Sequence, residues 1–197
     1  MSAPETAPAA APGRDVTLAV WPADIVELST YVIGSADARR RVAGLDLPPL
    51  GRCVATAEQL ALSTRPGRWL LLSARSAAGA TAERWMRACA GQGAVVELSS
   101  ALTTFLLGGA RAREVLSRGC RLDLAPELFQ TGHAAATIMA QVPVSLAAVP
   151  AGMLLLTPAS TAQHLGEWLA AAAAPFGLAL RPKVSLNELC EEGSPSQ

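Results

Sequence analysis

Short hydrophobic runs separated by turn residues recur along the chain and predict more strands than helices. Residues 15–33 are rich in β-branched side chains, and Pro22 interrupts them near the middle. Proline removes a backbone donor but is accepted at strand ends and bends. This stretch therefore predicts two strands with a bend between them.

Two further pairs of apolar runs predict hairpins. Pro66 and Gly67 separate residues 58–64 from residues 68–74. Proline presets φ for the first central position of a tight turn, and glycine accepts the positive φ of the second. Residues 94–109 contain another pair of apolar runs, joined so tightly that they also predict a hairpin.

The stretch 128–166 contains no Asp, Glu, Lys or Arg. A membrane-spanning helix needs about twenty predominantly apolar residues. Pro143, Pro150 and Pro158 break this run, so it predicts short strands and no membrane span. The strands are expected at 134–140, 142–148 and 152–157. Because they hardly alternate between apolar and polar residues, we expect both of their faces to be covered.

Four stretches predict helices, and residues 176–180 predict a last strand. Ser160 and Gln163 have the spacing of a capping box, and Gly119 is expected to end the third helix in the left-handed conformation. The helices are expected at 35–44, 77–91, 109–119 and 158–175. The expected apolar faces are Ala82, Trp85, Met86 and Cys89 in the second, Ala112, Val115 and Leu116 in the third, and Ala162, Leu165, Trp168, Leu169 and Ala172 in the fourth.

This element order predicts an α+β fold with largely antiparallel sheets and short helices, because tight turns join several neighbouring strands. We expect one domain over residues 15–182, which could divide into halves near 15–92 and 93–182. Residues 1–14 are rich in Ala and Pro and predict a disordered tail, and residues 183–197 predict a second tail. No strand leads into a glycine-rich nucleotide-binding motif or a P-loop.

The composition indicates a protein that is partly covered by a partner. Hydrophobic residues make up 51% of the chain and charged residues 16%, and the mean hydropathy is +0.31. Basic and acidic residues balance at 16 each. General nucleic-acid binding depends on summed neutralisation of phosphates, so this balance argues against it. Low charge also protects poorly against self-association, which favours a subunit of an assembly.

The four cysteines lie 36, 31 and 70 residues apart, at Cys53, Cys89, Cys120 and Cys190. No pair has the C-x-x-C spacing of a metal or redox site, so they predict cytosolic thiols. The first residues lack the cationic and apolar regions of a secretory signal, and we expect a cytoplasmic protein.

Arginines cluster after Gly108 and Gly109, where a predicted helix begins. Free amides at a helix start attract phosphate, so one interpretation is an anion site at these glycines. No lysine or Ser/Thr partner accompanies them, which favours the alternative of a solvated helix face. The arginines are Arg111, Arg113, Arg118 and Arg121.

His133, His164 and Asp123 are the residues with catalytic potential. Either histidine could act as a base, but neither belongs to an H-E-x-x-H motif. Asp123 follows a helix and could be a catalytic carboxylate or a turn cap, the commoner role of such residues. We expect no catalytic, cofactor-binding or metal-binding residue in this chain.

One segment carries a family resemblance. VLSRGCRLDL, followed after Ala125 by PELFQTGHAAATIMAQVPVSL, resembles the gamma subunit of heterotetrameric sarcosine oxidase. RWLLLSA upstream and EWLAAAAAPFGL downstream extend the likeness over roughly residues 35–180. The specific part is residues 116–146.

The resemblance implies a subunit of a complex that oxidatively demethylates sarcosine to glycine with tetrahydrofolate and yields hydrogen peroxide. It implies FAD, FMN, NAD and tetrahydrofolate in the partner subunits, none in this chain, and alpha, beta and delta subunits as partners. It also implies a fold like the folate-binding domain of aminomethyltransferases, without catalytic residues.

Three alternatives stay open. One is a scaffold unrelated to amines that the same apolar strands hold together. The Arg-Ser-Phe element that opens the last helix in this family is replaced by TPASTA at 157–162, which leaves room for a related N-methyl amine oxidase or demethylase complex. A stand-alone folate-binding C1 protein would need a carboxylate to hold the pterin, for which Asp123 is the only candidate, and a longer chain.

Overall fold

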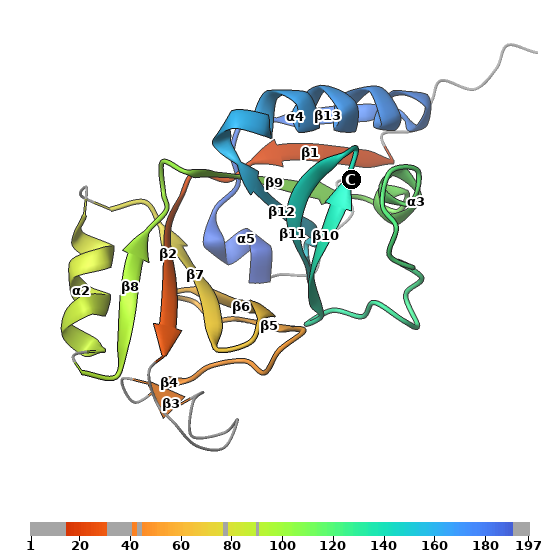
Figure 1. Cartoon of the computed structure of the whole chain (residues 1–197). Coiled ribbons are helices and arrows are strands. Elements are labelled where there is room, and N and C mark those ends of the chain that lie inside the picture. The colour runs from red at the N-terminus through yellow and green to blue at the C-terminus, as the bar shows by residue number, and fades with distance from the viewer. Residues whose placement is uncertain (1–14, 31–40, 43–44, 77–78, 90, 191–197) are drawn as a thin grey trace, which may run out of the picture.

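Two β-sheets stack face to face in the computed structural model, and helices cover their outer faces (Figure 1). The structure describes residues 15–30, 41–42, 45–76, 79–89 and 91–190. The predicted tail at 1–14 and most of the predicted helix at 35–44 lie outside these residues. The α+β class with largely antiparallel sheets is confirmed.

The larger sheet has six strands, and α3 (Ala112–Ser117) and α4 (Ala159–Ala173) cover its outer face. All of its neighbouring strands pair antiparallel except β1 and β13, which run parallel. The strand order is β10 (Ala134–Met139), β11 (Val142–Val149), β12 (Gly152–Pro158), β9 (Leu102–Gly108), β1 (Val16–Val20) and β13 (Leu178–Arg181).

The smaller sheet has five antiparallel strands, and α2 (Ala80–Ala88) covers its outer face. Its strand order is β5 (Arg52–Ala55), β6 (Leu60–Arg65), β7 (Arg68–Ala74), β2 (Ala23–Thr30) and β8 (Gly93–Glu97). The predicted hairpin at Pro66 and Gly67 is confirmed, with Gly67 at φ +67°.

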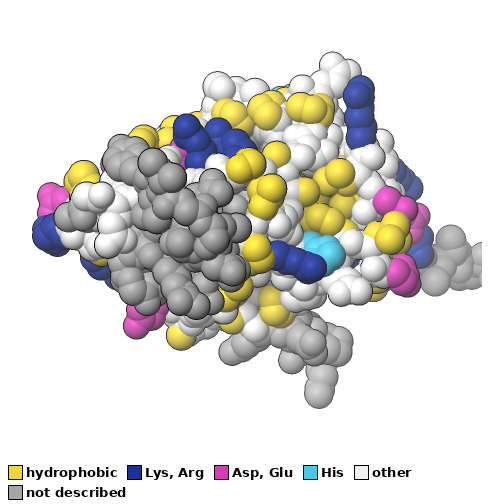
Figure 2. Space-filling model, turned by 60° about the horizontal axis from the view of Figure 1, so that its bottom comes forward, with side chains coloured by type: hydrophobic (Ala, Val, Ile, Leu, Met, Phe, Trp, Pro, Cys, Tyr) yellow, Lys and Arg dark blue, Asp and Glu magenta, His cyan; other side chains and the backbone are white. Residues whose placement is uncertain are grey.

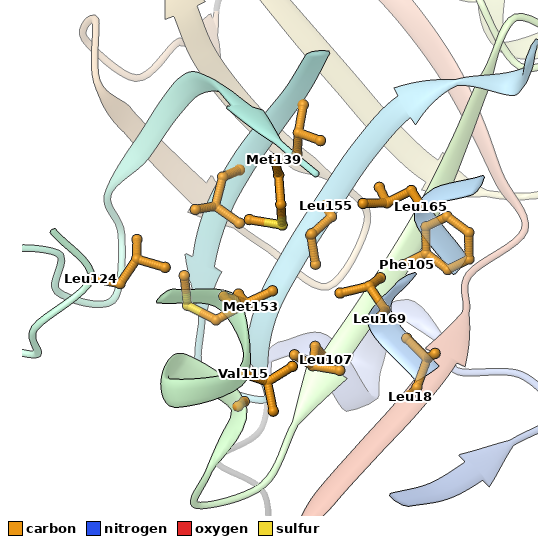
Figure 3. Packing of buried hydrophobic residues seen from close by; sticks show 14 of the residues in the cluster. Leu18, Phe105, Leu107, Val115, Leu124, Met139, Met153, Leu155, Leu165 and Leu169 are labelled. Atoms are coloured by element: carbon orange, nitrogen blue, oxygen red, sulfur yellow. The ribbon is translucent and has the colours of Figure 1, made fainter. Parts of the chain in front are cut away.

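Three hydrophobic clusters hold these layers together. One lies between the larger sheet and its helices, where Leu165 and Leu169 of α4 lie against Phe105 of β9 (Figure 3). The second lies between the two sheets, and the third lies under α2. Each leucine buried in this way contributes about 1.5–3 kcal/mol relative to an exposed one.

The predicted bend at Pro22 is the place where the chain passes from one sheet to the other. β1 ends at Val20 in the larger sheet, and β2 begins at Ala23 in the smaller one. The chain crosses back between β8, in the smaller sheet, and β9, in the larger sheet. These two strands therefore do not pair, and the predicted hairpin over 94–109 is wrong. The hydroxyl of Ser99 accepts a hydrogen bond from Ile25 N–H at 2.9 Å, which ties the crossing point to β2.

The strands predicted at 134–140, 142–148 and 152–157 form β10, β11 and β12. β11 and β12 are covered on both faces over most of their length, as expected. β10 is buried only at its two ends, and half-buried and exposed residues alternate between them, because the strand lies at the edge of its sheet.

Several local predictions are wrong for identifiable reasons. α4 begins at Ala159 without a side-chain cap, so Ser160 does not cap it, and Gln163 donates to Glu167 instead. In α2, Met86 is 51% exposed, although Trp85 beside it is buried. Arg41–Val42 forms the short strand β3, which pairs with β4 (Leu45–Asp46) where the end of a helix was expected.

The predicted tail at 183–197 is wrong for residues 183–190. α5 (Leu186–Cys190) follows β13, and Val184, Leu186 and Leu189 are buried in the cluster between the sheets. Ser185 and Glu188 form a reciprocal cap, in which Ser185 N–H donates to Glu188 Oε2 at 2.7 Å and Glu188 N–H donates to Ser185 Oγ at 3.4 Å. This S-x-x-E spacing is a helix-start signal that is visible in the sequence.

None of the described helices has both the length and the apolar character that crossing a membrane requires.

Candidate partner interface

An apolar strip on β10 and β11 extends beyond the cover of the smaller sheet. Ala134, at the start of β10, is buried between the sheets. Ala136 and Ile138 lie farther along the same face, because alternate strand residues point the same way. Ala136 is exposed and Ile138 is 45% exposed. Pro143 on β11 pairs with Ile138 and is also exposed.

Leu50 extends this strip at the start of β10. It is 57% exposed and precedes Gly51, whose carbonyl oxygen accepts a hydrogen bond from Ala134 N–H at 2.9 Å. We call Leu50, Ala136, Ile138 and Pro143 the β10 patch. Figure 2 looks toward the lower end of the molecule and shows hydrophobic side chains gathered on that face. Exposed apolar side chains grouped on one face are typical of contact sites for another molecule.

His133 adjoins the start of β10 and has structural contacts. Its backbone forms an isolated bridge with Arg52, which joins the two sheets at this corner. Its ring lies edge-on to Phe129, with the ring centroids 5.8 Å apart. His164 lies on α4, and its Nε2 is 3.0 Å from the carbonyl oxygen of Ala140, just past the other end of β10. The structure therefore does not bring the two histidines into one site.

Asp123 caps a turn. Its Oδ1 accepts a hydrogen bond from Ala125 N–H at 2.9 Å, and its side chain is exposed. Of the two roles that the sequence allows, the structure shows the turn cap. Within the described ranges, no ion pair links Asp123 or either histidine to an opposite charge.

Gly108 and Gly109 are required by close backbone packing. A Cβ atom on Gly108 would lie 2.8 Å from Thr17 Oγ1, and one on Gly109 would lie 2.2 Å from the carbonyl oxygen of Asp15. Gly109 also has φ +96°. The amide of Arg111 already donates to Asp15 O at 3.3 Å. These contacts account for the glycine pair without an anion.

The predicted solvated face of α3 is confirmed for Arg111, Arg118 and Glu114, which are exposed. The guanidinium groups of Arg111 and Arg118 lie over the ring of Phe176, at 5.0 and 4.5 Å from its centroid. Arg111 also pairs with Glu114 at 2.7 Å. Because Glu114 offsets the charge of Arg111, these three side chains leave one net positive charge on the surface beside η1 (Ala174–Phe176).

Arg113 has a different role, which sequence reasoning missed. It is half-buried, and its Nη1 donates to the carbonyl oxygens of Leu124 and Phe129, at 2.7 and 2.8 Å. This side chain therefore fixes the loop between α3 and β10. Helical spacing gives no signal for these bonds, because both acceptors are backbone atoms of a later segment.

The four cysteines are free thiols. Cys53 and Cys89 are buried, and burial raises the pKa of both thiols, that of Cys53 to about 11. They are therefore protonated core residues at neutral pH. Among the described residues, no group of three or more His, Cys, Asp or Glu side chains is arranged to hold a metal ion.

Comparison with models of protein families gives the same family as the resemblance seen in the sequence. The model of the sarcosine oxidase gamma subunit family matches residues 33–175. A sequence search of curated proteins found no match.

Two solved structures are similar to this chain. One chain of the heterotetrameric sarcosine oxidase from Corynebacterium sp. U-96, in complex with pyrrole 2-carboxylate, superposes with a TM-score of 0.72 at 27% identity, over 85% of this chain and 88% of that chain. The glycine cleavage system aminomethyltransferase T from Bartonella henselae superposes with a TM-score of 0.63 at 15% identity. That match covers 84% of this chain and 47% of the other, and it shows a shared fold.

Proposed function

Because this chain belongs to the sarcosine oxidase gamma subunit family, we propose that it is the gamma subunit of a heterotetrameric, flavin-dependent sarcosine oxidase. The complex oxidatively demethylates sarcosine to glycine with tetrahydrofolate and yields hydrogen peroxide. This chain contributes to assembly and stability and has no catalytic residue of its own. A cytoplasmic location is part of the proposal.

The observation that carries the proposal is the agreement between two matches. The family model spans residues 33–175, and the superposition with the Corynebacterium chain covers most of both chains. A likeness that extends over nearly a whole subunit supports the same role in an assembly. The aminomethyltransferase match supports the fold only, because a shared fold hosts unrelated functions.

Side-chain contacts support a non-catalytic role. The residues with catalytic potential hold turns and strand ends: Asp123 caps a turn, and His164 contacts the carbonyl oxygen of Ala140. In this proposal FAD, FMN, NAD and tetrahydrofolate are bound by the partner subunits.

The β10 patch is the proposed contact with a larger subunit. Ile138 and Leu50 keep about half of their surface exposed in the free chain, and Pro143 is exposed beside Ile138. Burial of apolar surface drives association, and interface cores are depleted of charge. The partners are the alpha, beta and delta subunits, and the patch faces one of them.

The test is a pull-down of the tagged full-length chain from its native host, with an absorbance spectrum of the eluate. We expect larger subunits to co-purify and the eluate to show a flavin spectrum. Bleaching of the flavin by a panel of N-methyl amines then separates sarcosine from a related substrate. A colourless, monodisperse single chain would overturn the proposal, and tetrahydrofolate binding by that chain would favour the stand-alone C1 protein.

A further inference from the structure

Among the four edge strands that the structure describes in the two large sheets, β10 is the one without a charged residue. β5 begins with Arg52, β8 ends with Glu97 and β13 ends with Arg181. β10 reads AAATIM and pairs with β11 in regular register (Figure 1). An edge strand presents unpaired N–H and C=O groups, and proteins usually protect it with charge, proline or a bulge. The edge of β10 lacks all three.

The chain itself covers both ends of this edge. At the start of β10, Ala134 N–H donates to the carbonyl oxygen of Gly51 at 2.9 Å. Just past its end, Ala140 N–H donates to the carbonyl oxygen of Gly119 at 3.2 Å. Both bonds point away from β11, and they limit the free edge to the middle of the strand.

Between these ends the edge is open at Ala136 and Ile138. The backbone groups of successive residues alternate between the two sides of a strand, so these two residues direct theirs to the same side as Ala134. The carbonyl oxygen of Ile138 accepts a hydrogen bond from Thr137 Oγ1 at 3.4 Å. Within the described residues, the other three groups, Ala136 N–H and C=O and Ile138 N–H, have no partner. Such a row fits an extended backbone of about three residues.

The open edge borders the β10 patch. Ala136 and Ile138 supply both the unpaired backbone groups and part of the exposed apolar surface. A strand that pairs with β10 would place every second side chain on the same face as this patch. Strand addition of this kind obtains affinity from backbone hydrogen bonds and specificity from alternate side chains.

An uncommitted arginine adjoins each end of the open stretch. Arg52 bridges to the residue before β10, and Arg121 follows Cys120, which bridges to the last residue of β10. Both arginines are exposed, and neither side chain has an ion pair or hydrogen bond in the described part of the chain. The nearby Asp123 caps Ala125 N–H instead. Two free positive charges favour carboxylates on the segment that docks between them.

We propose that a larger subunit adds a short extended segment to the open edge of β10. Its backbone pairs with Ala136 and Ile138, an apolar side chain lies on the β10 patch, and an acidic residue on each side reaches Arg52 or Arg121. This inference rests on the proposed function, because it states how a partner subunit meets this chain.

The first test is amide hydrogen exchange at single-residue resolution. The full-length chain is compared when free and when assembled in the complex purified from the native host. We expect exchange at Ala136 and Ile138 to slow by about tenfold or more in the complex, because each N–H gains a backbone partner. The amide of Val96, on the edge strand β8, is the internal reference and should exchange equally in both.

The second test removes one N–H from the edge. Ala136→Pro should lower co-purification with the larger subunits by about tenfold or more. The free chain should still fold, because edge strands accept proline where the N–H faces outward. Ala136→Ser keeps the N–H and a small side chain, so it should assemble normally. The exchange measurement needs no substitution, so it decides the proposal even if Ala136→Pro does not fold.

The third test concerns the acidic flanks of the docking segment. Arg52→Gln combined with Arg121→Gln should slow assembly several-fold at low salt, and the difference should disappear at high salt. Arg84→Gln combined with Arg87→Gln, on α2, removes the same charge from the outer face of the smaller sheet and should leave assembly unchanged.

Distinct outcomes would overturn the strand addition and the proposed function. If the larger subunits co-purify but Ala136 and Ile138 exchange as fast as in the free chain, the strand addition is wrong and the proposed function stands. Equal assembly of Ala136→Pro and Ala136→Ser would show that the patch packs through side chains alone. If no larger subunit co-purifies, both fail.

Discussion

The indole ring of Trp168 on α4 lies directly against the backbone of Gly119, just past the end of α3. A Cβ atom on Gly119 would come within 2.4 Å of the Trp168 ring. Trp168 is half-buried and packs against the hydrophobic cluster beneath the two helices. Gly119 has no positive φ, so close packing, and not the expected left-handed cap, requires glycine here.

Gly119→Ala should therefore destabilise the protein by about 1–3 kcal/mol through overpacking. The measurement is the free energy of unfolding in urea. Gly166→Ala on α4 is the matched control, because its Cβ would lie 3.4 Å from the Phe105 ring, an ordinary contact distance. The control should be neutral or stabilising by up to about 1 kcal/mol, since alanine favours a helix over glycine. Equal losses in both variants would contradict the packing argument.

Stability should fall in alkaline solution because of Cys53. Burial raises the pKa of this thiol from its ordinary value of 9.0 to about 11. Below pH 9 the thiol is protonated in both states, so its contribution to stability is fully present. Between these two values the unfolded chain loses the proton first, which removes up to about 3 kcal/mol of stability as pH rises.

The measurement for Cys53 compares the unmodified protein with Cys53→Ala under reducing conditions. The difference between their free energies of unfolding should shrink or change sign as pH rises from 9 to 11. Cys89 is present in both proteins, so its own titration cancels. A constant difference over this range would show that the thiol is accessible.

Asp24→Asn should destabilise the protein at neutral pH. Burial raises the pKa of Asp24, but hydrogen bonds from Ser76 and Thr81 and the charge of Arg75 outweigh it, so the pKa lies below 3.8. The stabilising contribution is therefore present above that value and is lost as pH falls below it. The variant weakens charge-assisted hydrogen bonds and should cost about 1–3 kcal/mol.

Urea unfolding at several pH values checks the role of Asp24. The difference between the unmodified protein and Asp24→Asn should narrow as the solution becomes more acidic than the ordinary pKa of 3.8. Asp123→Asn, at an exposed turn cap with one hydrogen bond, is the control and should cost less.

Ile138→Asp should weaken assembly while the free chain stays folded. Ile138 is 45% exposed in the β10 patch, so a carboxylate there remains solvated in the free chain and is buried in the proposed interface. Co-purification with the larger subunits should drop by tenfold or more, on the order of an interface hot spot. Val96→Asp, on the edge strand of the other sheet and 51% exposed, is the matched control. Normal assembly of Ile138→Asp would exclude the β10 patch from the interface.

Arg111→Glu combined with Arg118→Glu tests whether the stacked arginines meet acidic residues of a partner. Charge reversal should slow assembly, and the effect should shrink in high salt, because surface charge steers association. Phe176→Leu removes the ring beneath both guanidinium groups but keeps their charges, so it should assemble normally. Unchanged association rates for the double variant would show that these arginines face solvent in the complex.

The sequence by itself determined the elements whose signals are local. The turn at Pro66 and Gly67, the strands of residues 134–158 and the apolar face of α3 depend on the spacing of neighbouring residues, and all were predicted. The family resemblance was likewise readable from the sequence, mainly from residues 116–146, and the family model confirms it.

Only the tertiary structure decided which segments meet. The apolar runs at 94–109 look like a hairpin, but β8 pairs with β2, and β9 pairs with β1 on one side and with β12 on the other. Gly119 and Arg113 acquire their roles from atoms of other elements. Local spacing fixes what each segment prefers to be. Which other segment each one packs against is set by burial and backbone pairing across the whole chain.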